Sequence, residues 1–139
     1  MSTDANKAVL RRFDEEVWNA GHLEVMDELF APDYVNHDPS LGQTGDREGH
    51  KRTIALARAA LPDVRETVED LVAEGDRVAF RWTIRATHLG ELFGTQPTGN
   101  AVHIGGIEIY RLRDERIVER WGVFDRLGLM QQLGIVPRR

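Results

Sequence analysis

The sequence predicts an α+β fold in which helices pack on one face of a twisted antiparallel β-sheet. Up to Pro62, apolar residues recur every three or four positions, which is the period of an amphipathic helix. After Pro62 the period changes to two, and Gly75-Asp76 and Asp114-Glu115 are typical of tight turns between paired strands. A short segment near the C-terminus returns to the helical period. Helices followed by a run of strands indicate separate α and β layers.

Three helices are predicted before the change of period, over residues 3–21, 22–30 and 50–61. In the first of them, Val9, Phe13 and Val17 recur every four residues and form an apolar stripe. Pro32 ends the second helix, and the segment "YVNHDP" that follows is predicted as a brief extended stretch.

Two hairpins follow, over residues 64–87 and 101–124, with a long Gly- and Pro-rich loop between them and a short helix over residues 126–134 after them. One strand of the first hairpin alternates between an apolar face and a basic face, formed by Val78, Phe80, Trp82 and Ile84 and by Arg77, Arg81 and Arg85. In the second hairpin, a turn at 114–115 places Arg113 opposite Arg116 and Ile109 near Trp121.

The last strand ends at Asp125, which is a candidate base. Alternation gives Trp121, Val123 and Asp125 a common face, shared with Ile107 and Ile109 on the neighbouring strand. Because this face is mostly apolar, we expect it to point at the helices and to leave Asp125 partly desolvated at the mouth of a pocket. A shift of one residue in the register would turn these side chains to the opposite face of the sheet. The local sequence also suits Asp125 as the N-cap of the last helix, so both roles are open.

Length and composition are those of a single globular domain over residues 1–139, with 41% hydrophobic residues. The net charge of −5 and the absence of a basic patch argue against a nucleic-acid partner. Without cysteine there is no disulfide, thiolate nucleophile or Cys-containing metal site. No apolar run reaches the roughly 20 residues of a membrane span. We therefore expect a cytoplasmic protein that does not enter a membrane.

Four segments carry a resemblance to a known family: "YVNHDP", "EGDRVAFRWTIRATHLGELFGTQPTG", "GIEIYRLRDERIVERWGVFD" and "LMQQLG". With the order of elements, they resemble the SnoaL-like polyketide cyclases, also called ester cyclases, of the ketosteroid-isomerase-like superfamily. The resemblance extends from about Lys7 to Pro137. It implies a cone-shaped, curved antiparallel sheet with the N-terminal helices on its concave face. It also implies a homo-oligomer, either a dimer or a tetramer.

The resemblance further implies a carbon–carbon bond-forming enzyme that closes a ring by intramolecular aldol condensation without a cofactor. Asp125, in "WGVFD", stands at the position of the family's acid/base aspartate. Asn36 and His37, in "YVNHDP", match polar residues of the family's pocket, and "THLG" brings His88 to the pocket or its rim. Asn36 is equally suited to a turn before Pro39, and a lone histidine such as His88 is often a hydrogen-bonded residue at a sheet edge.

The remaining pocket wall is predicted to be apolar and to suit a flat hydrophobic substrate. The candidate substrate-binding residues are His37, Trp82, Phe93, Ile107, Trp121 and Trp18, and the loop residue Phe93 is a candidate lid. The third strand departs from the family's pattern, because Gly105, Gly106 and Ile107 supply no side-chain hydrogen bonds where other cyclases have polar residues. No metal site is predicted, since the histidines lack the spacing of a local ligand motif.

These residues lead to one hypothesis with two rivals. In the main hypothesis, Asp125 removes a proton from the carbon alpha to an ester or ketone in a small hydrophobic carbonyl substrate. Asn36 or His88 then holds the resulting enolate. One rival keeps the base but changes the reaction, to an isomerisation or an epoxide hydrolysis. The other is a non-catalytic module that binds a small ligand, which Gly105 and Gly106 favour slightly.

Overall fold

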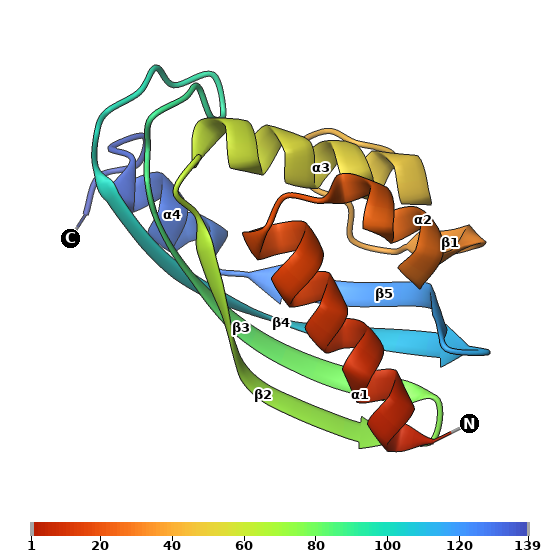
Figure 1. Cartoon of the computed structure of the whole chain (residues 1–139). Coiled ribbons are helices and arrows are strands. Elements are labelled where there is room, and N and C mark those ends of the chain that lie inside the picture. The colour runs from red at the N-terminus through yellow and green to blue at the C-terminus, as the bar shows by residue number, and fades with distance from the viewer. Residues whose placement is uncertain (1, 139) are drawn as a thin grey trace.

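The computed structural model describes residues 2–138 and confirms the α+β fold (Figure 1). Its helices are α1 (Thr3–Arg12), α2 (Met26–Leu29), α3 (Arg47–Ala60) and α4 (Arg126–Gln132). Its strands are β1 (Phe30–Asn36), β2 (Arg65–Glu74), β3 (Arg77–Thr87), β4 (Ala101–Arg113) and β5 (Arg116–Phe124). They form one sheet in the order β1-β5-β4-β3-β2, which is antiparallel except that β1 runs parallel to β5.

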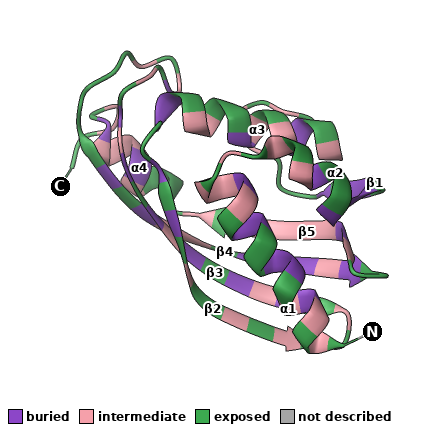
Figure 2. Ribbon diagram, in the orientation of Figure 1, coloured by how far each residue is buried: buried purple, intermediate pink, exposed green. Residues whose placement is uncertain are grey.

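The sheet is curved, and α1 and α3 lie over the same face of it, with α4 beyond the end of β5 (Figure 1). Along β3, buried residues alternate with exposed or partly exposed ones (Figure 2). The core between the layers contains Phe13, Phe30, Tyr34 and Tyr110, all with 2% exposure or less. Phe30 makes edge-to-face contacts with Phe13 and Tyr34 at ring-centroid distances of 5.1 and 4.8 Å. The predicted packing of helices on one face of the sheet is thus confirmed.

The first helix continues beyond α1 as a π-helical segment, Phe13–Asn19. Its wider turn places Asn19 against the edge strand β2. There the Asn19 side chain donates to the Glu66 carbonyl at 2.9 Å and accepts the Glu66 N–H at 2.7 Å. On the open edge of β2, these two bonds satisfy the Glu66 backbone groups that no neighbouring strand reaches. They also fix the end of the helix, including Trp18, over the sheet.

The region of the predicted second helix differs from expectation. A 3₁₀ turn, Leu23–Val25, and the single-turn helix α2 are followed directly by β1, which begins at Phe30. Pro32 therefore lies within a strand and does not simply end a helix. It is tolerated there because β1 is an edge strand, where a missing N–H need not break the ladder.

Both predicted hairpin turns are confirmed, as is the register of the second hairpin, with Arg113 opposite Arg116 and Ile109 opposite Trp121. The predicted orientation of that hairpin is wrong. Ile107 is 50% exposed and Val123 is 73% exposed, so their face is the convex one. The concave face instead carries Glu108 and Tyr110 of β4 and Arg120 of β5. The two charged side chains can be buried there because they form an ion pair.

Candidate active site

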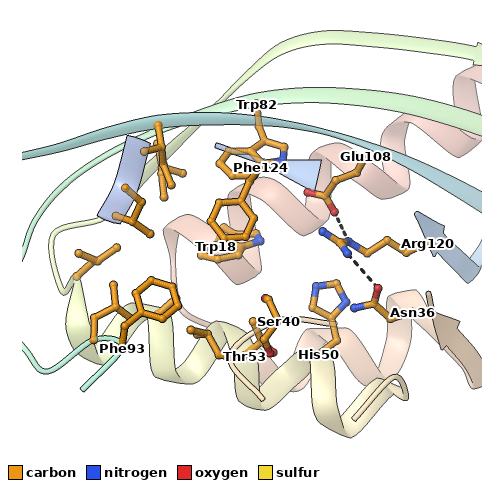
Figure 3. Close-up of a pocket in the computed structure, with 17 residues that line it drawn as sticks. Trp18, Asn36, Ser40, His50, Thr53, Trp82, Phe93, Glu108, Arg120 and Phe124 are labelled. Carbon is orange, nitrogen blue, oxygen red and sulfur yellow. Dashed lines mark hydrogen bonds and ion pairs between the residues drawn. The ribbon is translucent and has the colours of Figure 1, made fainter. Parts of the chain in front are cut away.

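A cavity of about 100 Å³ lies between the concave face of the sheet and α3. Its walls are mainly apolar and aromatic, and Figure 3 shows Trp18, Trp82, Phe93 and Phe124 around it. Six polar residues also line it: Asn36, Ser40, His50, Thr53, Glu108 and Arg120. An apolar cavity with a few convergent polar groups is typical of a small-molecule site.

Glu108 and Arg120 form a buried ion pair in the wall of this cavity. The Arg120 Nε–H and the Tyr110 hydroxyl both donate to the same oxygen of Glu108, Oε2. Within residues 2–138 the other oxygen, Oε1, accepts no hydrogen bond. Gly122 leaves room for the pair, because a Cβ there would lie 2.8 Å from Arg120 Nη2 and 2.9 Å from Glu108 Cγ. The cavity thus holds a fixed carboxylate with one unused oxygen.

Asn36 is joined to this pair from the neighbouring strand, since it lies opposite Arg120 in the parallel ladder of β1 and β5. The Asn36 side-chain oxygen accepts hydrogen bonds from Arg120 Nη1 and from the Asp38 N–H, each at 3.0 Å. The second bond is the turn that the sequence allowed, and the first places the amide in the cavity wall. Because both bonds use the oxygen, the amide N–H₂ remains a donor on the side of His50 (Figure 3).

His50 is a further polar residue of the cavity wall, and the sequence did not single it out. The predicted third helix begins at residue 50, whereas α3 begins at Arg47 with Asp46 as its N-cap, so His50 faces the sheet from inside the first turn. Its Nδ1 lies 2.9 Å from the Tyr34 hydroxyl. Burial lowers the pKa of His50 to about 3, and the positive charge of Arg120 acts in the same direction. The imidazole is therefore neutral at physiological pH.

Asp125 lies outside this cavity. Its side chain is exposed, and Oδ1 accepts the Gly128 N–H at 2.8 Å as the N-cap of α4. It borders a groove on the convex side, with Gly105, Ile107 and Val123. The cap role is thus observed, whereas the role as a base rests on the resemblance alone.

The other predicted site residues divide into two groups. Trp18, Asn36, Trp82 and Phe93 line the cavity, whereas His37, His88, Ile107 and Trp121 do not. His88 is fully buried, and its Nδ1 accepts the Thr98 N–H at 3.1 Å, which joins the two ends of the loop between β3 and β4. His37 stacks on Trp121 with ring centroids 5.0 Å apart and lies 2.8 Å from a Glu119 oxygen.

Two further observations concern the part of the chain that the structure describes. Residues 2–138 contain no cluster of three or more His, Asp or Glu side chains arranged to hold a metal ion. None of the helices in this range combines the length and the apolar composition needed to cross a membrane.

The comparisons with known proteins agree with this architecture. IdmH from Streptomyces antibioticus, described as a candidate polyketide cyclase, is 36% identical over 93% of this chain and 98% of its own, with a TM-score of 0.80. AclR from Streptomyces galilaeus, described as a candidate hydroxylase, is 32% identical over 99% of this chain and 86% of its own, with a TM-score of 0.88. TsrD from Streptomyces laurentii is 26% identical over 98% and 99% of the two chains, with a TM-score of 0.88.

No curated protein matches the chain. The family model of the SnoaL-like polyketide cyclases, however, matches residues 8–133, which is nearly the whole of it. The fold, the family model and the structural relatives therefore agree, and the chain belongs to the SnoaL-like polyketide cyclase family.

Proposed function

We propose that the protein is an acid/base cyclase that closes a ring in a small hydrophobic carbonyl substrate by intramolecular aldol condensation, without a cofactor. The observation that carries this proposal is the Glu108 carboxylate, held in an otherwise apolar cavity with Oε1 free of hydrogen bonds within residues 2–138. Family membership supports the general activity, and the polar residues of the cavity support the reaction type.

In the proposed reaction, Glu108 Oε1 takes a proton from the carbon alpha to an ester or ketone. The resulting enolate carbon attacks a second carbonyl of the same substrate, which forms the carbon–carbon bond and leaves an alkoxide. The proton then returns from Glu108 to that alkoxide, so the base is regenerated. Arg120 and Tyr110 hold the carboxylate in position throughout these steps.

The enolate oxygen needs donors, and two neutral groups of the cavity supply them. The Asn36 amide presents its N–H₂, because its oxygen is occupied by Arg120 and Asp38. In the tautomer of His50 that carries its proton on Nε2, the Tyr34 hydroxyl donates to Nδ1 and the ring presents an N–H as well. Fixed donors aimed at developing charge favour the transition state over the ground state.

One rival reaction has less support. Epoxide opening calls for two carboxylates around a water molecule, and Glu108 is the one carboxylate among the cavity-lining residues of the described chain. The non-catalytic binding module differs from the proposal only in whether a proton is removed, and therefore calls for a test of proton abstraction.

Solvent exchange provides this test. Ethyl benzoylacetate is incubated in D₂O with the protein, and incorporation of deuterium at its alpha carbon is followed by NMR against buffer alone. We expect exchange above the buffer rate, lost in Glu108→Gln and retained in Asp125→Asn. Loss in Asp125→Asn with activity kept in Glu108→Gln would instead assign the base to Asp125. Exchange at the buffer rate in the parent, despite binding of the ester, would overturn the proposal in favour of the binding module.

A further inference from the structure

The indole of Trp82 is a buried hydrogen-bond donor without a partner. Trp82 is 8% exposed and lines the cavity from β3. Within residues 2–138 its Nε1–H meets no acceptor. An indole nitrogen can only donate, and native folds rarely leave a buried donor unpaired. The missing acceptor is therefore expected among the molecules that enter the cavity.

Gly106 on β4 holds the indole in this position. It lies opposite Trp82 in the ladder, and a Cβ there would be 2.5 Å from Cζ2 and 2.8 Å from Cε2 of the ring. Cε2 is bonded to Nε1, so the nitrogen-bearing side of the indole rests on the bare backbone of Gly106. A larger residue at 106 would crowd the ring, and its Cβ would also lie 2.7 Å from the backbone oxygen of Val123. Gly106 supplies no polar side chain on β4, and its lack of a side chain leaves room for the indole N–H of Trp82 on β3.

The unpartnered donor lies close to the proposed base. Glu108 follows Gly106 by two residues on the same face of β4, so Trp82 and Glu108 are diagonal neighbours in the sheet. Figure 3 shows the Trp82 ring and the Glu108 carboxylate on the same wall of the cavity. This wall thus presents an N–H donor and, in Oε1, a free carboxylate oxygen.

We propose that Trp82 is a substrate-binding residue whose Nε1–H donates to a carbonyl oxygen of the substrate, and that the site therefore selects flat, aromatic ketones or esters over hydrocarbons of the same shape. The inference rests on the proposed function, because it places the bound carbonyl next to Glu108. The apolar walls take the rings, and Trp82 orients the oxygen. When the enolate carbon attacks that carbonyl, charge grows on its oxygen and the bond to Trp82 strengthens.

Two naphthalenes of nearly equal shape test the proposal. In 2-acetylnaphthalene the side chain ends in a carbonyl oxygen, and in 2-isopropenylnaphthalene a CH₂ group takes its place. Their dissociation constants are measured for the parent, for Trp82→Phe, and for Trp121→Phe as a matched control outside the cavity. We expect the parent and the control to prefer the ketone by about 3- to 10-fold, the effect of one hydrogen bond. Trp82→Phe should lose that preference and still bind the hydrocarbon.

The outcomes separate the two proposals. If neither naphthalene binds the parent, the cavity does not take flat aromatic ligands and this inference fails, whereas the deuterium exchange of the ester still decides the proposed function. If both bind the parent equally, or if Trp82→Phe keeps the preference for the ketone, only the role of Trp82 is overturned.

A second measurement needs no variant at position 82. The protein contains three tryptophans, so its ¹H–¹⁵N spectrum is expected to show three indole N–H signals. Addition of 2-acetylnaphthalene to the parent should move one of them downfield, and 2-isopropenylnaphthalene should not. In Gly106→Ala, where the new Cβ displaces the ring, this downfield shift should disappear. A signal that responds alike to both ligands would contradict the proposal.

Discussion

His50 shows how a single buried side chain links the site to the stability of the fold. Its imidazole is neutral, since burial and the Arg120 charge lower its pKa from 6.5 to about 3. Between these two values the unfolded chain binds a proton that the folded protein does not. The free energy of unfolding therefore decreases as the pH falls from 6.5 towards 3, by about 1.4 kcal/mol per pH unit for this one group.

The contribution of His50 can be isolated with His50→Gln. Chemical denaturation of the parent and the variant at several pH values from 3.5 to 7 gives two stability curves. All other titrating groups are common to both proteins, so the difference between the curves reports on His50. We expect the parent to be more stable than the variant at pH 7 and to lose that advantage as the pH falls. A difference that does not change with pH would show that His50 does not resist protonation in the folded state.

At the scale of elements, the two loops at the mouth of the cavity carry backbone strain. Leu41, between β1 and α3, has a φ of +54°, and Phe93, between β3 and β4, has a φ of +52°. Both residues line the inner cavity and also an outer hollow of about 430 Å³, so they stand between the two spaces. The Arg126 guanidinium of α4 lies 5.3 Å from the centre of the Phe93 ring and holds it there. Non-glycine residues keep such a conformation only where surrounding contacts impose it.

We predict that Phe93 controls entry to the cavity. Phe93→Ala should speed both the association and the dissociation of 2-acetylnaphthalene, because the ring that separates the two spaces is removed. Stopped-flow fluorescence measures both rates, and Leu127→Ala, an exposed residue of α4 that does not line the cavity, serves as the control. Unchanged rates in Phe93→Ala would place the entrance elsewhere.

The same elements show what the sequence could and could not reveal. The turn at Asp114-Glu115 is local, so the register of β4 and β5 could be counted from it. The orientation of that hairpin depends on the pairing of β4 with β3, and the loop of residues 88–100 between them is too long for such a count. That pairing puts Gly106 opposite Trp82 and turns Glu108 inward. Glu108 and Arg120 were therefore missed, because charged residues normally face solvent unless they are paired.

At the scale of the whole molecule, the convex face of the sheet carries several exposed apolar side chains among the exposed arginines of β3. Val72 of β2 and Ile109 of β4 lie in one row across the ladders, and Ile107 of β4 lies opposite Val123 of β5. All four are exposed in the single chain. Exposed apolar side chains grouped in this way typically mark an interface. The helices cover only the concave face, so a second copy of the chain is the partner that we propose for the convex one.

This assembly gives the last prediction. The parent should elute as a homo-oligomer in size-exclusion chromatography with light scattering, and Val123→Lys should shift it towards the monomer, because a charge would be buried in the interface. Leu56→Lys places the same charge on an exposed residue of α3, on the opposite layer, and should leave the oligomer intact. Because the cavity lies on the concave side, the Val123→Lys monomer should still bind 2-acetylnaphthalene. A monomeric parent, or equal dissociation by both lysines, would show that the convex face does not form the interface.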